Sequence, residues 1–183
     1  MIGDGDSLAV VKTRHWLERI VIGLNLCPFA AAPYRADRIL YAVSDEAALE
    51  GIYQAFLATL QDLLSSDPHQ QETALLILAG GLASFDDYLD ALAVFEGALA
   101  EAGLEGLVQL ASFHPHYRFE GANDDDPANY TNRSPLPMFH LIREDGLAAA
   151  LESYPQPELI PERNIRRLRE LGMDGIAELL NRP

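Results

Sequence analysis

The feature that most constrains the fold of this chain is an apolar run, Ala74–Ala79, that ends in Gly80-Gly81. A run of this length without a polar residue is typical of a strand that is buried on both faces. Such strands occur mainly in sheets whose two faces are covered by helices. The run therefore predicts a central strand of an α/β sheet.

The segments around this run alternate between strand and helix patterns. Residues 39–43 alternate as a short strand does, and the apolar stripe over 49–64 predicts a helix that ends near Ser65. Ser84 is the expected N-cap of a second helix, and residues 107–113 form a third strand. The order strand, helix, strand, helix, strand predicts parallel pairing through right-handed crossovers.

The two ends of the chain add helices and one more strand. A first helix is expected over 7–24, followed by a loop over 25–35 that contains two prolines. A fourth strand over 138–142 can run in either direction, and Gly172 divides a helical tail. The expected fold class is α/β: one domain over 1–183, a sandwich with a small, mostly parallel four-stranded sheet flanked by helices. The helical C-terminal tail covers about 161–183.

The charge balance narrows the choice of partners. The 183 residues include 13 Lys plus Arg against 28 Asp plus Glu, a net charge of −15. A charge of this sign repels phosphate backbones and anionic lipids, so we expect neither a nucleic-acid partner nor a membrane partner. One cysteine excludes an intramolecular disulfide, and no signal-like or membrane-spanning segment is visible. We expect a cytoplasmic protein, and the oligomeric state stays open.

A long segment without periodicity connects the third and fourth strands. Loops of this length are usually functional or disordered, and the aromatic residues here argue against disorder. The loop begins at the carboxyl end of a strand, where ligands collect in parallel sheets. We therefore expect a site in the 113–144 segment. The candidates are His114 and His140 for acid–base catalysis, and Tyr117, Asn129, Tyr130, Asn132, Arg133 and Arg143 for substrate binding.

The distribution of cations suggests an anionic ligand for this loop. Residues 39–117 contain 12 acids and neither Lys nor Arg, whereas Arg118, Arg133 and Arg143 lie around the loop. Arginine forks suit bidentate capture of carboxylate or phosphate. The alternative is that these arginines pair with Asp124–Asp126 and order the loop without taking part in any reaction.

Cys27 is a third candidate catalytic residue. Followed by Pro28 in an expected loop, its thiol could act as a nucleophile activated by a neighbouring His or Arg. The alternative is a buried apolar plug formed with Leu26 and Phe29, since free cysteine is among the most buried residue types.

A metal site is an alternative use of the same histidines. The His114-Pro115-His116 spacing puts two imidazoles on one side of an extended chain. Together with His140 and a carboxylate such as Asp125 or Asp126, they could bind Zn²⁺ or Fe²⁺. The competing interpretation is a pair of loop histidines that are hydrogen-bonded to the backbone. No further metal-binding or nucleotide-binding motif accompanies them, so no cofactor is predicted and a divalent metal stays the alternative.

Three segments carry a resemblance to a known family. They are GLNLCPFA (Gly23–Ala30), FHPHYRFEGANDDDPANYTNRSPLPMFHLIRE (Phe113–Glu144) and IPERNIRRL (Ile160–Leu168). With them the chain resembles a bacterial family catalogued as domain of unknown function number fourteen-fifteen. The resemblance implies no activity. It implies that the signature residues are Cys27, Pro28, His114, Pro115, Tyr117, Asp125, Asn129, Tyr130, Asn132, Arg133, His140, Arg143 and Glu144.

Two function classes follow from these observations. The first is a small enzyme, a hydrolase or transferase, that acts on a small anionic metabolite with His acid–base chemistry and Arg anion binding. The second is a non-catalytic module that senses a metabolite or docks a protein partner. A buried, unreactive Cys27 and histidines tied to backbone carbonyls would favour the second class.

Overall fold

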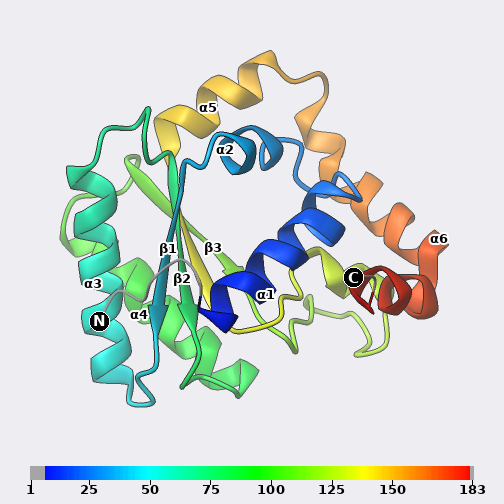
Figure 1. The fold of residues 1–183 in the computed structure, drawn as a ribbon, viewed down its shortest axis with the longest axis horizontal. Coiled ribbons are helices and arrows are strands. Elements are labelled where there is room, and N and C mark those ends of the chain that lie inside the picture. Colours follow the sequence, from blue (N-terminus) through cyan, green and yellow to red (C-terminus); the bar gives the residue numbers. More distant parts are fainter. Residues whose placement is uncertain (1–6, 182–183) are drawn as a thin grey trace.

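The computed structural model describes residues 7–181 and contains a four-stranded sheet with the order β1-β2-β4-β3 (Figure 1). The expected α/β class is confirmed. The strands are β1 (Ile39–Ser44), β2 (Thr73–Leu78), β3 (Val108–Phe113) and β4 (Met138–Arg143). β2 is buried along its whole length, as the apolar run predicts.

The sheet is mixed because β4 lies between β2 and β3. β1 and β2 pair in parallel, while β4 is antiparallel to both of its neighbours. β1, β2 and β3 thus run in one direction. The expected parallel pairing is correct for β1 and β2 and wrong for β3, because β4 lies between β2 and β3. The sequence left the direction of the fourth strand undecided, and the structure shows that it is antiparallel to both neighbours. Met138 at its start therefore lies beside Phe113 at the end of β3.

Helices cover both faces of the sheet (Figure 1). On one face lie α3 (Leu49–Ser65) and α4 (Phe85–Glu101). The hydrophobic core between these helices and the sheet includes Phe56, Phe95 and Phe139. The other face carries α1 (Leu8–Trp16), the π-helical segment η1 (Leu17–Ile22) and α6 (Ile160–Asn181). Successive residues of β2 alternate between the two cores, as the pleat of a strand requires.

The N-terminal elements follow the sequence pattern with one correction. Ser7 caps α1 by accepting a hydrogen bond from the Val10 amide at 3.3 Å. The expected loop over 25–35 is wrong at its end, where α2 (Ala31–Arg35) forms. Pro33 lies in the first turn of this helix, where an amide N–H has no intrahelical acceptor, so the proline removes no bond.

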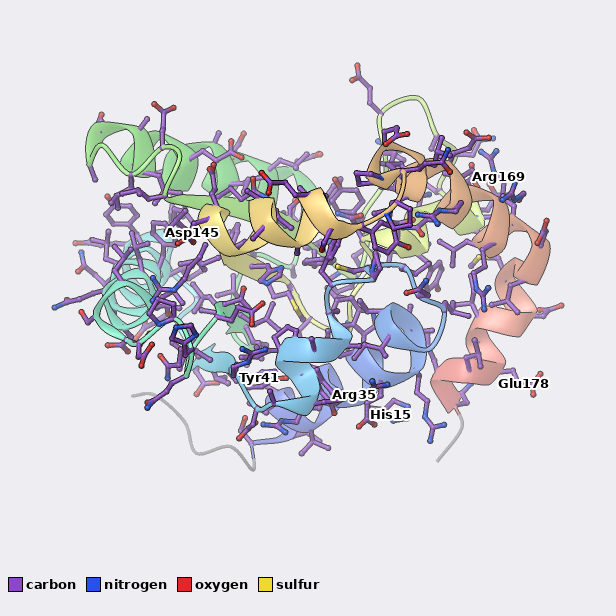
Figure 2. All side chains as sticks on the ribbon, turned by 90° about the horizontal axis from the view of Figure 1, so that it is seen from above. His15, Arg35, Tyr41, Asp145, Arg169 and Glu178 are labelled. Atoms are coloured by element: carbon purple, nitrogen blue, oxygen red, sulfur yellow. The ribbon has the colours of Figure 1, made fainter. Side chains whose placement is uncertain are left out.

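The segment after β4 contains a helix that the sequence pattern did not lead us to expect, α5 (Glu144–Ser153). Two short 3₁₀ helices also occur, η2 (Pro127–Thr131) within the long loop and η3 (Pro157–Leu159) before α6. The expected break in the tail is confirmed, because Gly172 has φ 69° inside α6. Beyond the break, α6 returns to α1, where His15 Nε2 donates to the Leu180 carbonyl at 3.1 Å (Figure 2).

Within residues 7–181, no helix combines the length and the apolar character that a membrane crossing requires.

Candidate functional site

His114 is buried at the start of the long loop, and both of its ring nitrogens are used. Nδ1 accepts from the His116 amide at 3.0 Å, and Nε2 donates to the Leu82 carbonyl at 3.0 Å. Burial lowers the pKa of this imidazole below its usual value. His114 is thus a neutral ring that fastens the loop to the segment before α4, with no ring nitrogen left for a substrate.

The two loop asparagines are used in the same way. Asn129 is fully buried; its Oδ1 accepts from the Phe119 amide at 3.1 Å and its Nδ2 donates to the Asn123 carbonyl at 2.8 Å. Asn132 Nδ2 donates to the Ser112 carbonyl at 2.9 Å. These amides replace regular secondary structure in satisfying the backbone of the loop.

The arginines of the loop also bind its backbone and its acids. Arg133 donates from Nε to the Tyr117 carbonyl at 2.9 Å, and its guanidinium lies over the Tyr130 ring. Arg118 pairs with Asp124 at 2.9 Å. Asp126 pairs with Arg169 of α6 at 2.6 Å and caps η2 through the Ala128 amide. Of the three arginines considered above, Arg118 thus makes the expected ion pair with the acidic run, whereas Arg133 orders the loop through backbone carbonyls.

The residues proposed as a metal alternative do not gather into a ligand set. His116 and Asp125 are exposed, and His140 lies in β4. Across residues 7–181, no group of three or more His, Cys, Asp or Glu side chains is placed to bind one ion.

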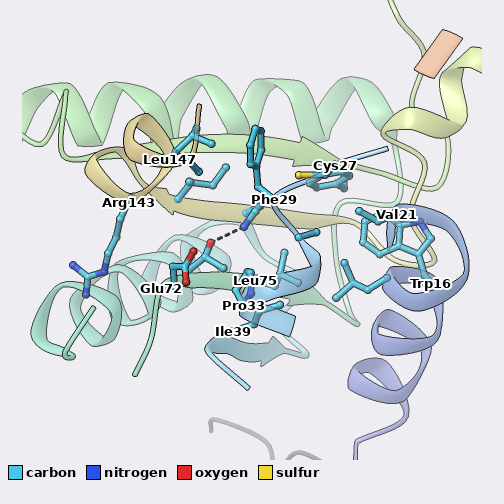
Figure 3. A pocket seen from close by; sticks show the side chains of 18 residues that line it. Trp16, Val21, Cys27, Phe29, Pro33, Ile39, Glu72, Leu75, Arg143 and Leu147 are labelled. Atoms are coloured by element: carbon cyan, nitrogen blue, oxygen red, sulfur yellow. Dashed lines mark hydrogen bonds between the residues drawn. The ribbon is translucent and has the colours of Figure 1, made fainter. Parts of the chain in front are cut away.

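An apolar pocket lies elsewhere, on the sheet face that carries α1 and α2, toward the end where β1 and β2 begin (Figure 3). Its cavity volume is about 130 Å³, close to the roughly 150 Å³ of an apolar cavity that binds benzene. Residues of α5 line it together with residues of the sheet. The apolar lining includes Trp16, Leu17, Val21, Phe29, Pro33, Ile39, Leu75, Phe113, Ile142, Leu147 and Ala150, and the polar lining is Cys27, Glu72, Thr73, His140 and Arg143.

Thr73 determines the protonation of His140 in this pocket. The Thr73 hydroxyl donates to the Leu141 carbonyl at 2.7 Å, and its oxygen lies 2.6 Å from His140 Nε2 (dashed line in Figure 3). A carbonyl only accepts, so the single hydroxyl proton is committed to it, and the hydroxyl oxygen must accept from Nε2–H. His140 therefore presents Nδ1 as a lone-pair acceptor, which has no partner among the described residues.

The electrostatics of the pocket favour neutral groups. Burial lowers the pKa of His140 to about 4, so the ring is uncharged at neutral pH. Burial raises the pKa of Cys27, against the opposing effect of the Phe29 and Ala30 amides, so the thiol keeps its proton. Desolvation disfavours the charged form of each group, which is an imidazolium in one case and a thiolate in the other.

The two charged side chains that line the pocket already have partners. Arg143 donates to the carbonyls of Gln71, Leu63 and Ser66, and so caps the C-terminal end of α3. Glu72 pairs with Arg38 at 3.1 Å. The lining thus offers an apolar surface, a thiol, an unpartnered nitrogen of His140 and the buried Nε1–H of Trp16, which also has no hydrogen-bond partner among the described residues.

Three of the residues selected from the sequence meet in this pocket: Cys27, His140 and Arg143. His114, Asn129, Asn132 and Arg133 remain in the loop. Thr73 begins an apolar strand and belongs to no motif, so no sequence signal marks it as a site residue. The helix α5, by contrast, has a sequence signal that the expectations above do not use: Glu144 and Asp145 in a first turn, followed by Leu147, Ala150 and Leu151 at helical spacing.

Comparison with known proteins identifies one family. No curated protein and no solved structure matches this chain. A family model described as "Protein of unknown function (DUF1415)" matches residues 9–178, a range that includes the pocket, the long loop and most of α6. The chain therefore belongs to the DUF1415 family.

Proposed function

We propose that the pocket beside α5 binds a small, uncharged and mostly apolar molecule that donates one hydrogen bond to Nδ1 of His140. The Thr73–His140 hydrogen bond carries this proposal, because it leaves Nδ1 as an unpartnered acceptor among the described residues. An apolar surface with one oriented polar atom is the usual composition of a small-molecule site. This binding requires no cofactor.

The charged residues of the pocket argue for an uncharged ligand. Arg143 and Glu72 are engaged with α3 and with Arg38, so an anion entering here would find no unpaired cation in the lining. Burying such an anion without a partner is strongly unfavourable. The proposal therefore departs from the expected capture of an anionic metabolite by the loop.

A second candidate function is a hydrolase or transferase that uses Cys27 and His140, because both side chains line one pocket. In this reaction Nδ1 accepts the thiol proton while sulfur attacks an electrophilic carbon of the ligand. The leaving group then takes that proton from His140 as its bond to carbon breaks. This reaction needs a Cys27 thiolate beside a His140 imidazolium. The raised pKa of Cys27 and the lowered pKa of His140 both disfavour these charged forms, so we rank ligand binding ahead of catalysis.

We also propose a bacterial source and a cytoplasmic location. The lone cysteine suits a reducing compartment. A net charge of −15 disfavours association with nucleic acid or anionic membranes.

Filling the pocket tests the binding proposal. The probe is the neutral apolar dye Nile red, whose fluorescence rises on entering an apolar site. Ala150→Trp places an indole among the lining residues, whereas Ala149→Trp changes an exposed neighbour on the same helix. We expect Ala150→Trp to abolish dye binding and Ala149→Trp to leave it unchanged. Equal binding by both variants would exclude this pocket as the site.

A matched pair of probes tests the role of His140. Phenol carries one hydrogen-bond donor and toluene carries none, at similar size. The preference is the dissociation constant of toluene divided by that of phenol. Because one net hydrogen bond is lost in His140→Phe, we expect this ratio to be roughly threefold to tenfold higher in the wild type than in the variant. The same preference for phenol in both proteins would show that Nδ1 of His140 does not bind the phenol hydroxyl.

A further inference from the structure

A second hollow lies between the first turns of α6 and the turn that follows η1. Its cavity volume is about 230 Å³. Leu24, Asn25 and Asn164 contribute to its walls, and its charged lining is Arg163, Arg166, Arg167 and Glu170. Three arginines around one hollow are unusual in a chain with 13 basic and 28 acidic residues.

The sequence spacing places the three arginines on one side of α6. Residues three and four apart are neighbours on a helix surface, so Arg163 lies beside both Arg166 and Arg167. Arg163 is half-buried, and its guanidinium lies 5.5 Å from the centre of the Tyr154 ring. Tyr154 thereby restricts one of the three cations before any ligand binds.

A buried amide holds the opposite wall in place. Asn164 is 5% exposed, and its Nδ2 donates to the Leu26 carbonyl at 2.8 Å. Asn25, in the turn itself, has φ 53°, a left-handed conformation that asparagine tolerates better than most residues. The hollow is thus formed by a helix and a turn that are fastened to each other.

Among the described residues, the arginines of the hollow are absent from the identified ion pairs. These pairs include Arg14–Asp37, Arg38–Glu72, Arg118–Asp124 and Arg169–Asp126. Arg169, a neighbour on the same helix, is neutralised by Asp126. Glu170 is the single acid in the lining of the hollow, so its cations outnumber its acids.

We propose that this hollow binds a small multivalent anion, with phosphate or carboxylate groups that receive bidentate hydrogen bonds from Arg166 and Arg167. Guanidinium groups match the geometry of both anions. The hollow also includes Ile160, the first residue of α6, where the helix dipole favours negative charge. A small ligand fits better than a nucleic acid, since the net charge of −15 repels a polyanionic strand.

The proposal concerns residues outside the apolar pocket and does not depend on the function proposed for it. The same signature segment contributes to both sites: Leu24 and Asn25 line the hollow, while Cys27, Phe29 and Ala30 line the pocket.

Calorimetric titration of the full chain tests the anion site. The probes are pyrophosphate and citrate, with sodium chloride at matched ionic strength as the reference. We expect one equivalent of pyrophosphate or citrate to bind, and the tighter of the two identifies phosphate or carboxylate as the preferred group. Binding of neither probe above the chloride reference would overturn the proposal.

Substitution of the arginines locates the binding. We expect Arg166→Gln/Arg167→Gln to weaken it at least tenfold and Arg167→Lys to weaken it less, because lysine keeps the charge and loses the fork. Lys12→Gln/Arg35→Gln, at two exposed positions of α1 and α2, removes the same number of charges and is the matched control; Figure 2 labels Arg35. An equal loss in this control variant would show non-specific attraction and refute the site. Unchanged thermal unfolding of the double variant establishes that its fold is intact.

Discussion

Thr73 and His140 are joined by a hydrogen bond of 2.6 Å, although 67 positions separate them in the chain. They lie diagonally across the β2–β4 ladder, since Thr73 pairs with Ile142 and Leu75 pairs with His140. The Leu141 carbonyl receives the hydroxyl proton, so the threonine can only accept from the imidazole. One small polar side chain therefore determines which nitrogen of His140 carries the proton and which is an acceptor.

Replacing this hydroxyl tests its role. Thr73→Val keeps the volume and removes two hydrogen bonds, and we expect the free energy of unfolding to fall by about 1–3 kcal/mol. We also expect His140 to lose its single tautomer, which ¹⁵N NMR of the ring nitrogens detects. Thr73→Ser retains the hydroxyl and serves as the control. Identical ring spectra for the valine variant and the wild type would contradict the assignment.

The low pKa of His140 predicts a loss of stability in acid. Its folded pKa of about 4 lies below the ordinary value of 6.5, so the unfolded chain binds the proton more tightly. The stabilisation is complete above pH 6.5 and is lost as the pH falls toward 4. Between pH 7 and 4, we expect the wild type to lose up to about 3 kcal/mol more than His140→Gln does.

Urea unfolding at a series of pH values measures this difference. The pKa of His114 is also lowered by burial, but this residue is present in both proteins, so its contribution cancels. Parallel pH profiles for wild type and His140→Gln would show that His140 titrates normally.

The raised pKa of Cys27 predicts a slow thiol. The thiolate is the reactive form, and its fraction at a given pH falls tenfold for each unit by which the pKa rises. We expect iodoacetamide to alkylate Cys27 at pH 8 more slowly than it alkylates free cysteine. Because the chain has a single cysteine, mass spectrometry follows this site alone. Alkylation at or above the rate of free cysteine would instead favour the nucleophile function.

Asp126 anchors the long loop, and its two roles can be separated. Asp126→Asn keeps an acceptor for the Ala128 amide and removes the charge that faces Arg169, whereas Asp126→Ala removes both. We expect the alanine variant to lose about 1 kcal/mol through the missing cap and the asparagine variant to lose less. Thermal unfolding of the three proteins measures this order, which equal losses in both variants would contradict.

The Asp126–Arg169 ion pair also predicts how the free energy of unfolding changes with pH. Arg169 and the Ala128 amide hold the pKa of Asp126 at about 2, below its ordinary 3.8. The contribution of the carboxylate is therefore present above pH 4 and disappears as the pH falls toward 2. We expect the wild type and Asp126→Asn to converge in stability over this range.

Local sequence patterns were sufficient for most of the elements. The apolar stripe over 49–64 predicts α3, Ser84 caps α4 as expected through the Asp87 amide, and Gly172 interrupts α6. These signals depend on neighbours a few residues apart, which the chain itself provides. Missing α5 was a failure to use such a signal, because its acidic first turn and apolar spacing are visible in the sequence.

The candidate site was predictable only in part. His140, Cys27 and Arg143 were selected for the chemistry of their side chains. The same criterion also selected His114, Asn129 and Arg133, which order the loop instead. The distinction depends on what each polar atom contacts. His114 meets a backbone donor and a backbone acceptor, while His140 meets a hydroxyl on one nitrogen only.

The sequence by itself determined the α/β class, the central buried strand, the caps of α1 and α4 and the break in α6. Only the tertiary structure decided that β4 enters between β2 and β3, that Thr73 meets His140, and that α5 lies over the face where Cys27 is found. The physical reason is the range of the interactions. Periodicity and capping act within one turn or one strand, whereas strand order and hydrogen-bond partners depend on residues that are distant in the chain.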